Sequence, residues 1–220
     1  MVLQEIWRYP VKSMAGERLD RTTAGPVGLH GDRVVQVYDA RGRLVTARTH
    51  PDLLGLHATL GTDGEPLVDG RLWSAPDVRE RVERIVGAGA RLVRNEHEAR
   101  FDVLPLLVAT DGAIAAFGRD ARRLRPNLII GGVEGLDERG WERRMLRIGP
   151  LLIALADLRG RCVMTTVDPD TLARDPRVLK DIVQRFDGHL ALNAEVIQGG
   201  ELRVGTPAEL LRDVAASAVG

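Results

Sequence analysis

The sequence predicts a mainly β protein, rich in β-barrel structure and carrying a few short helices. Short apolar runs recur along most of the chain, and turns that contain glycine or proline separate them. Only three segments have the pattern of a helix. The 220 residues are enough for one large domain or two small ones. A doubly wound α/β sheet, in which helices alternate with strands, does not fit this pattern.

The first half of the chain reads as short strands joined by tight turns. "LQEIWRYPV" alternates loosely like a strand until Pro10 interrupts it. "RVVQVYDARGRLVTAR" predicts a hairpin, because two apolar runs flank a turn in which Gly42 can take a positive φ. A second hairpin is expected around Gly61 to Gly64. An amphipathic helix then starts at Pro76 and ends in glycines.

The second half continues with buried strands and two further helices. "LPLLVAT" predicts a buried strand, and a short helix opened by Asp111 follows it. Strands are also expected in "NLIIGG", "WERRMLRIG" and "LLIALADL", and a hairpin around Gly199–Gly200. "DPRVLKDIVQRF" predicts an amphipathic helix with a buried stripe of Val178, Leu179, Ile182, Val183 and Phe186. A polar, alanine-rich tail follows Arg212.

Composition and charge exclude several functional classes. The formal net charge is zero, so no overall field attracts nucleic acid or an acidic membrane. No apolar run reaches the length of a membrane span, and no export signal opens the chain. With one cysteine and no such signal, we expect a cytoplasmic protein. An iron–sulfur cluster held by four thiolates cannot be built from a single cysteine.

Common catalytic motifs are absent from the sequence. The five histidines, which are His30, His50, His57, His97 and His189, are scattered, and none lies at zinc-ligand spacing from Cys162. No G-x-S-x-G motif supplies a nucleophile elbow. A P-loop and a dinucleotide-binding glycine fingerprint are missing as well.

What remains is a set of cationic and polar side chains beside tight turns. Any one of them alone would be an ordinary solvated surface residue. Together they suit an elongated anionic ligand, with cations for a phosphate and with hydroxyl and amide groups for ring heteroatoms. Arginine matters here, because its planar fork grips phosphates and carboxylates bidentately. The set consists of Lys12, Ser13, Arg33, Arg48, Arg125 and Asn127.

Cys162 has two interpretations from local chemistry. Unpaired cysteine is often a small buried hydrophobe, and "CVMTTV" looks like a strand that goes inward. Against this, Arg159 and Arg161 flank the thiol, and nearby positive charge favours a reactive thiolate. Local chemistry leaves both interpretations open.

A family resemblance connects these residues. In chain order, "YPVKS", "GDR", "TAR", "RPN" and "RCVMTTVDPDT" resemble the MOSC family, which is related to the C-terminal domain of molybdenum cofactor sulfurase. The resemblance extends from about Leu3 to Leu210 and is strongest to the amidoxime-reducing members. It implies a β-barrel-rich fold, with a MOSC N-terminal β domain at residues 1–95 and a MOSC domain at residues 96–215. The cofactor is expected in the cleft between them.

The resemblance also implies a molybdenum cofactor, in which molybdenum is held by a pterin, molybdopterin. Cys162 would supply a thiolate ligand to the metal, as a soft donor suited to a sulfur-rich centre. The residues expected to cradle the cofactor are Lys12, Ser13, Arg33, Arg125 and Asn127, together with Arg48. Asp168 and Asp170 are expected to form turn hydrogen bonds around Pro169.

The implied activity is a two-electron reduction of an N-hydroxylated or N-oxide substrate, with the oxygen leaving as water. Asp157, or a water near it, could deliver a proton. The chain has no nucleotide, flavin or cluster motif and stops at Gly220, so the donor is expected to be a separate protein. A ferredoxin, a flavodoxin or a b-type cytochrome would serve. We expect a monomer without nucleic-acid or membrane partners.

Three departures from the family keep two alternatives open. Members often have a second cysteine or an acid before the ligand, where this chain has Asp157 and Gly160. The common "VGD" reads Val204-Gly205-Thr206, and "DVLPLLVATD" is more apolar than in the amidoxime reducers. The first alternative is a sulfur carrier or sulfurtransferase with a persulfide on Cys162. The second is a carrier protein for the molybdenum cofactor.

Overall fold

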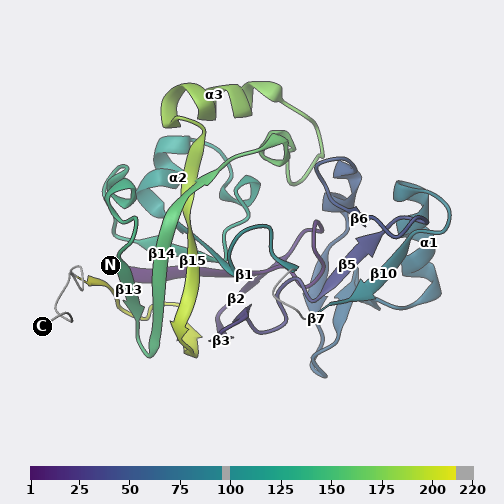
Figure 1. The fold of residues 1–220 in the computed structure, drawn as a ribbon, viewed down its shortest axis with the longest axis horizontal. Coiled ribbons are helices and arrows are strands. Elements are labelled where there is room, and N and C mark those ends of the chain that lie inside the picture. The colour runs from purple at the N-terminus through teal and green to yellow at the C-terminus, as the bar shows by residue number, and fades with distance from the viewer. Residues whose placement is uncertain (96–99, 212–220) are drawn as a thin grey trace, which may run out of the picture.

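The computed structural model describes residues 1–95 and 100–211 and confirms a mainly β protein. Figure 1 shows two lobes side by side. The first contains the long strands β14 (Leu151–Gly160) and β15 (His189–Gln198), and the second contains helix α1 (Pro76–Val86) and several short strands. Three features expected from the sequence lie at or outside the limits of these ranges. They are the domain boundary at residues 95/96, His97 and the alanine-rich tail.

Eight strands form the large sheet of the first lobe, in the order β17-β13-β14-β15-β11-β12-β1-β2. Strands β11 and β12 pair in parallel, and the other neighbours pair antiparallel. The remaining bounds are β1 (Val2–Arg8), β2 (Glu17–Leu19), β11 (Leu106–Thr110), β12 (Leu128–Gly131), β13 (Met145–Ile148) and β17 (Ala208–Leu211).

Backbone hydrogen bonds close this sheet into a barrel. Leu3 N donates to Thr206 O at 2.9 Å, and Ala208 N donates to Met1 O at 3.0 Å. These bonds bring the start of β1 against the chain that enters β17, although the two strands lie near opposite ends of the strand order. The sheet therefore curls round on itself, as a barrel requires. Leu3, Ile6 and Leu128 are completely buried in its apolar core.

The second lobe is built from small three-stranded sheets. One contains β10 (Arg91–Arg94), β5 (Val35–Tyr38) and β6 (Leu44–Val45), and another contains β7 (Ala58–Leu60), β8 (Pro66–Val68) and β9 (Arg71–Leu72). Both predicted hairpins are confirmed, and Gly42 takes a φ of +76° in the first turn. Val35, Val78 and Val82 are buried in a core of their own.

The predicted helices are present, with two differences in detail. Helix α2 (Asp111–Phe117) is capped by Thr110, whose hydroxyl oxygen accepts from Ala113 N, so Asp111 is its first residue rather than its cap. Helix α3 (Pro176–Phe186) buries Val178, Ile182 and Phe186. Val183 was expected in that stripe but is 55% exposed. Among the described residues, no helix is long and apolar enough to span a bilayer.

The expected hairpin at Gly199–Gly200 is wrong. Strand β16 (Gly200–Arg203) leaves β15 and pairs antiparallel with β3 (Arg21–Gly25), which also pairs with β4 (Gly28–Leu29). The chain passes so close to β3 that a Cβ on Gly199 would lie 2.5 Å from Ala24 O. The glycines therefore allow a crossing between sheets instead of a return.

The strand expected in "CVMTTV" is also wrong, because Val163–Thr166 form the 3-10 helix η5. The hydroxyl of Thr165 donates to Cys162 O at 2.8 Å, and that of Thr166 donates to Val163 O at 2.7 Å. Such side-chain to backbone bonds compete with strand pairing. Cys162 consequently lies at the turn where the chain leaves β14.

Candidate functional site

The six residues expected to cradle a ligand and Cys162 line one pocket of about 130 Å³. The second lobe and the chain leading to it supply Lys12, Ser13, Arg33 and Arg48, while Arg125, Asn127 and Cys162 come from the barrel side. The structure thus brings together residues that are spread over 151 positions of the chain, from 12 to 162 inclusive. Asp157 is not part of the lining. Its carboxylate accepts a hydrogen bond at 3.1 Å from the side chain of Asn193, and Asn193 does line the pocket.

Three lining residues adopt a left-handed backbone that side chains other than glycine rarely take. Their φ angles are +72° for Ser13, +55° for Arg33 and +57° for Arg125. Pro10 ends β1, and Arg125 precedes Pro126, so neither segment can continue a regular strand or helix. Backbone strain that recurs around one pocket is typical of functional sites.

Two buried residues, Tyr9 and Asp32, form a support layer beneath the cations. The guanidinium carbons of Arg33 and Arg125 lie 5.0 and 4.2 Å from the centre of the Tyr9 ring. The Tyr9 hydroxyl donates to Pro126 O at 3.1 Å, and burial raises the pKa of Tyr9 to about 12. The aromatic face attracts both arginines, which offsets part of their mutual repulsion.

Asp32 is completely buried and connects three parts of the site. Its carboxylate accepts from Tyr9 N at 2.7 Å, from Asn127 Nδ2 at 3.2 Å and from the guanidinium of Arg33. Asn127 also donates to Trp7 O and accepts from Leu107 N, both at 3.2 Å. The Asn127 amide is therefore committed to neighbouring groups, and its main effect is to hold Arg33 and the entering chain in place.

Asp102 is a single carboxylate among the cations that line the pocket. It pairs with Lys12 at 2.7 Å, with Arg48 at 2.6 Å and with Arg159 at 3.6 Å. Burial by itself would raise the pKa of Asp102, but Lys12 and Arg48 outweigh that effect and lower it to about 2. Burial lowers the pKa of Lys12, and the bond to Asp102 opposes this shift.

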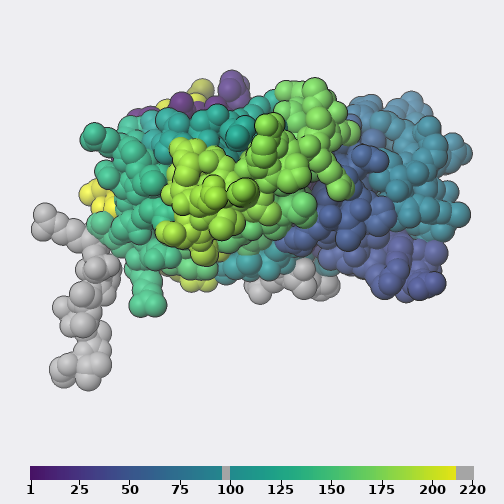
Figure 2. All heavy atoms as spheres, turned by 90° about the horizontal axis from the view of Figure 1, so that it is seen from above, coloured from purple at the N-terminus to yellow at the C-terminus, as the bar shows by residue number. Residues whose placement is uncertain are grey.

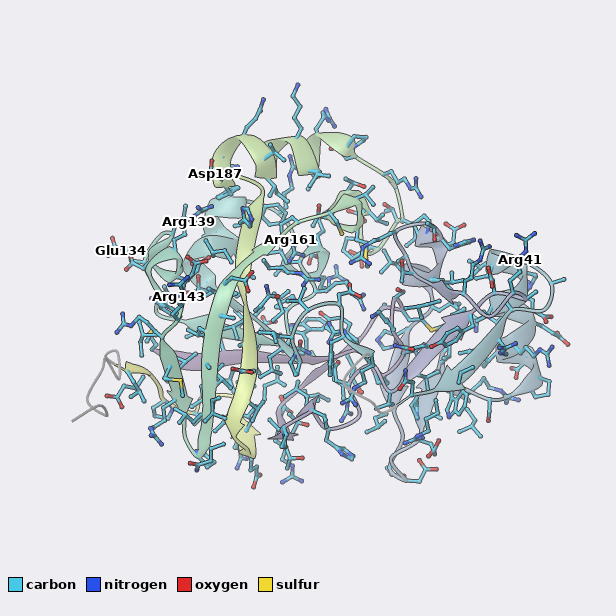
Figure 3. The ribbon with its side chains drawn as sticks, viewed as in Figure 1. Arg41, Glu134, Arg139, Arg143, Arg161 and Asp187 are labelled. Carbon is cyan, nitrogen blue, oxygen red and sulfur yellow. The ribbon has the colours of Figure 1, made fainter. Side chains whose placement is uncertain are left out.

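Cys162 is a free thiol in the lining of the pocket, and it is half-buried. The guanidinium groups of Arg48 and Arg161 both interact electrostatically with the thiol. Figure 3 places Arg161 directly after β14 in the middle of the molecule, whereas Arg41 and Arg143 lie toward its outer edges. The thiol therefore lies beside two guanidinium groups.

Two buried guanidinium atoms lack a hydrogen-bond partner within the described ranges. They are Nη2 of Arg125 and Nε of Arg161. Burial lowers the pKa of both arginines to about 10. A buried donor without an acceptor is costly, so these atoms indicate that the pocket is built for a group that accepts hydrogen bonds.

Sequence reasoning missed several residues that shape the site: Tyr9, Asp32, Asp102, Arg123 and Asn193. Tyr9 and Asp32 stand inside "YPVKS" and "GDR", next to residues that were selected, so the motifs themselves carried that signal. Asp102 and Asn193 had no local signal, because only the fold brings them to the pocket. The described residues contain no group of three or more His, Cys, Asp or Glu placed to hold a metal.

The fold and the pocket together define a class: a closed β barrel with a side lobe and a cationic pocket that carries one thiol. Family models then identify it. A MOSC N-terminal beta barrel domain matches residues 1–90, and a MOSC domain matches residues 111–209. The chain belongs to the MOSC family.

Curated relatives match most of the chain at low identity. "Mitochondrial amidoxime reducing component 2" of Macaca fascicularis is 24% identical, over 83% of this chain and 71% of the relative. "Mitochondrial amidoxime-reducing component 1" of Homo sapiens is 24% identical, over 76% of this chain and 66% of the relative. Among solved structures, the YUAD protein of Bacillus subtilis covers 95% of this chain and 94% of its own, with a TM-score of 0.53 and 11% identity. At that identity the likeness supports the fold alone.

Proposed function

We propose that this chain is a molybdenum-cofactor oxidoreductase that reduces N-hydroxylated or N-oxide substrates. The observation that carries the proposal is the placement of the only thiol, Cys162, in the lining of a pocket whose charged side chains are all cationic except Asp102. The names of the curated relatives, which are amidoxime-reducing components, point the same way. The reaction would add two electrons and two protons to the N–O group and release water.

The residues present fit the molybdenum cofactor in charge and in donor type. The cofactor's phosphate and pterin need cations and hydrogen-bond donors, and the pocket offers Lys12, Arg33 and Arg125, including the unpartnered Nη2 of Arg125. Cys162 supplies the soft donor that a sulfur-rich metal centre takes. The bound group would supply the two-electron redox chemistry. A ligand of that size needs more room than about 130 Å³, so Arg48 and Asp102, at the exposed end, would have to move aside.

The side chains of the protein would have separate tasks in this proposal. Lys12, Arg33 and Arg125 bind and orient the anionic end of the cofactor, while Tyr9 and Asp32 keep the two arginines in place. Cys162 would act as the metal ligand, because its sulfur is the soft donor in the lining. Asp157 lies outside the lining, so the proton source would be water at the exposed end of the pocket. Electrons would come from a separate electron-transfer protein.

The test is metal and pterin analysis of wild type and Cys162→Ser, purified from a host that makes the cofactor. We expect near-stoichiometric molybdenum and pterin in the wild type, and loss of amidoxime reduction in the serine variant with the fold retained. A serine hydroxyl is a harder donor and much less acidic, so the metal centre would change. Folded wild-type protein that carries neither molybdenum nor pterin would reject the proposal.

The same preparations address the two alternatives. A persulfide on Cys162 without bound metal would favour a sulfur carrier. Bound cofactor without turnover, under a strong chemical reductant, would favour a cofactor carrier. Arg33→Ala and Arg125→Ala are expected to lose the cofactor rather than slow the chemistry, since each removes a charge-assisted contact.

A further inference from the structure

A second hollow, larger than the cationic pocket, adjoins it and is not used by the proposed function. This groove has a volume of about 720 Å³, within the range of small-molecule sites. One side is formed by β1, β2 and the 3-10 helix η1 (Pro51–Gly55), and the other by the 3-10 helix η3 (Ala121–Arg123) and the chain after β14. Figure 2 shows that chain packed against the second lobe.

The walls of the groove are mainly apolar. They include Trp7, Leu54, Met164, Val167 and Leu172. The Trp7 indole donates to Glu5 at 2.6 Å, which fixes the orientation of its ring. The two sides come close together at Gly55 and Leu172. A Cβ added to Gly55 would lie only 2.8 Å from Leu172 Cδ1. A rigid, aromatic-lined slot of this kind suits a flat molecule.

The lining carboxylates of the groove are neutralised by ion pairs, so the remaining charge in the groove is positive. The lining carboxylates are both paired with arginines: Glu17 with Arg8 at 2.8 Å, and Asp170 with Arg122 at 2.7 Å. Arg125 also lines the groove, and its Nη2 has no partner among the described residues. The groove would therefore accept a neutral or negatively charged molecule and disfavour a cation.

The groove is continuous with the cationic pocket through shared residues. Arg123, Arg125 and Met164 line both spaces. Met164 comes two positions after Cys162, in the same 3-10 turn. Leu172 and Arg125, on the groove side, both have the strained left-handed backbone, with φ of +60° and +57°. A molecule lying in the groove would thus extend toward the side of the pocket that holds the thiol.

We propose that this groove binds the substrate, and that it selects flat aromatic molecules that are neutral or negatively charged. Trp7 and Leu172 would contact the ring system, and the excess of arginines over carboxylates in the lining would attract the negative end. The reaction of that substrate rests on the proposed function, whereas its binding does not. The two parts can therefore be tested separately.

The binding test uses the full chain as purified and two matched probes, naphthoate and naphthylmethylammonium, in isothermal titration. We expect naphthoate to bind and the ammonium probe to bind at least several-fold more weakly. Trp7→Ala should weaken naphthoate binding about tenfold by removing one aromatic wall. Equal affinity for both probes, or unchanged naphthoate binding in Trp7→Ala, would overturn the assignment.

A milder variant covers the case in which Trp7→Ala does not fold. His57 is exposed on the groove, and His57→Glu adds a negative charge without disturbing the core. Naphthoate should bind about two- to fivefold more weakly and the ammonium probe more tightly. His30→Glu is the matched control, because it places the same change on an exposed residue outside both spaces. An equal effect of the two variants would show that the probe does not lie in the groove.

The kinetic test then connects the groove to the reaction. In cofactor-loaded enzyme, His57→Glu should raise KM for an aromatic amidoxime that bears a carboxylate and leave kcat unchanged. KM for a small aliphatic amidoxime should not move. Probe binding as predicted, without any turnover, would reject the proposed function and keep the groove as a ligand site. Turnover with KM unaffected by the groove variants would reject the groove as the substrate site.

Discussion

Arg33 and Arg125 carry like charges, yet both lie over the ring of Tyr9, with guanidinium carbons 5.0 and 4.2 Å from its centre. Because the two guanidinium groups are already held close together, binding an anion between them does not require additional free energy to overcome their mutual repulsion. The ring contributes its electron-rich face, and Asp32 below contributes a full negative charge to Arg33. The strained φ of each arginine is held by this arrangement.

Two substitutions at Tyr9 separate the ring from its hydroxyl. Tyr9→Phe removes only the bond to Pro126 O, so it should cost about 1 kcal/mol of stability and leave anion binding intact. Tyr9→Leu removes the aromatic face and should weaken binding of pyrophosphate about tenfold. Isothermal titration and thermal melting measure the two effects. If both variants bind pyrophosphate equally, the ring does not position the arginines.

At the scale of elements, Arg100 and Asp102, which precede β11, are held at the pocket by Lys12 and Arg48. Lys12 Nζ donates to Arg100 O at 2.7 Å and pairs with Asp102, which also pairs with Arg48. Asp102 thus connects the chain before β11 to the turn after β1 and to the chain after β6. Those same cations are the ones expected to meet the ligand, so the carboxylate competes with an incoming anion.

This connection gives the stability a specific pH dependence. The pKa of Asp102 is lowered in the folded chain, from an ordinary 3.8 to about 2, so its contribution is present above about pH 4. That contribution is lost as the pH falls from about 4 to about 2, because the proton binds the unfolded chain more readily. Asp102→Asn should therefore be less stable than wild type at neutral pH, and the difference should shrink across that window.

Denaturant unfolding at a series of pH values measures the difference. Asp20→Asn, which changes an exposed acid outside the pocket, serves as the control. A constant difference between wild type and Asp102→Asn at all pH values would show that the ion pairs contribute nothing to folding. At neutral pH, the same Asp102→Asn variant should bind pyrophosphate more tightly, since it no longer competes for Lys12 and Arg48.

Gly199 is where the chain passes closest to β3 as it crosses from β15 to β16. In Gly199→Ala, the added Cβ would meet Ala24 O at 2.5 Å, so one of the two strands must shift. We expect a loss of about 1–3 kcal/mol in the free energy of unfolding, the range of overpacking changes. Gly25→Ala is the control, because nothing lies within 4 Å of its added Cβ. Equal melting temperatures for the two variants would contradict the close contact.

Local patterns predicted most of the secondary structure, and they failed where a distant element decided the outcome. The hairpin at Gly42 follows from its turn residues alone. The crossing at Gly199 does not, because two adjacent glycines also fit a tight turn, and only the position of β3 distinguishes the two. The 3-10 turn after Cys162 was likewise hidden, since Val and Thr favour strands until the threonine hydroxyls bond locally.

At the scale of the whole molecule, the motifs selected residues that line one pocket, but they did not select all residues of its lining. Lys12, Arg33, Arg125 and Cys162 stand in short, distinctive motifs, and the closed barrel with its side lobe brings them together. Asp102 and Asn193 reach the pocket only through the strand order. Information of that kind lies in the whole fold and not in any stretch of sequence.

The proposed function takes its electrons from a separate electron-transfer protein. We predict no reduction of an amidoxime with NADH or NADPH alone, and reduction once a reduced viologen is supplied to cofactor-loaded protein. Absorbance of the oxidised viologen measures the rate. Direct turnover with NADPH in the absence of any partner would contradict the prediction.

The backbone hydrogen bonds between Met1–Leu3 and Thr206–Ala208 form the seam that closes the barrel, and this seam affects how the chain acquires its fold. During folding, β1 pairs with β12 but can be fixed along the seam only when the distant residues 206–208 reach it. Until then β1 exposes apolar side chains, such as Leu3 and Ile6, that the finished barrel buries completely. Contacts this distant in sequence make folding slow. The folding chain therefore passes through a period in which the barrel stands open, and the cationic pocket, which needs both lobes, can be completed only when that period ends.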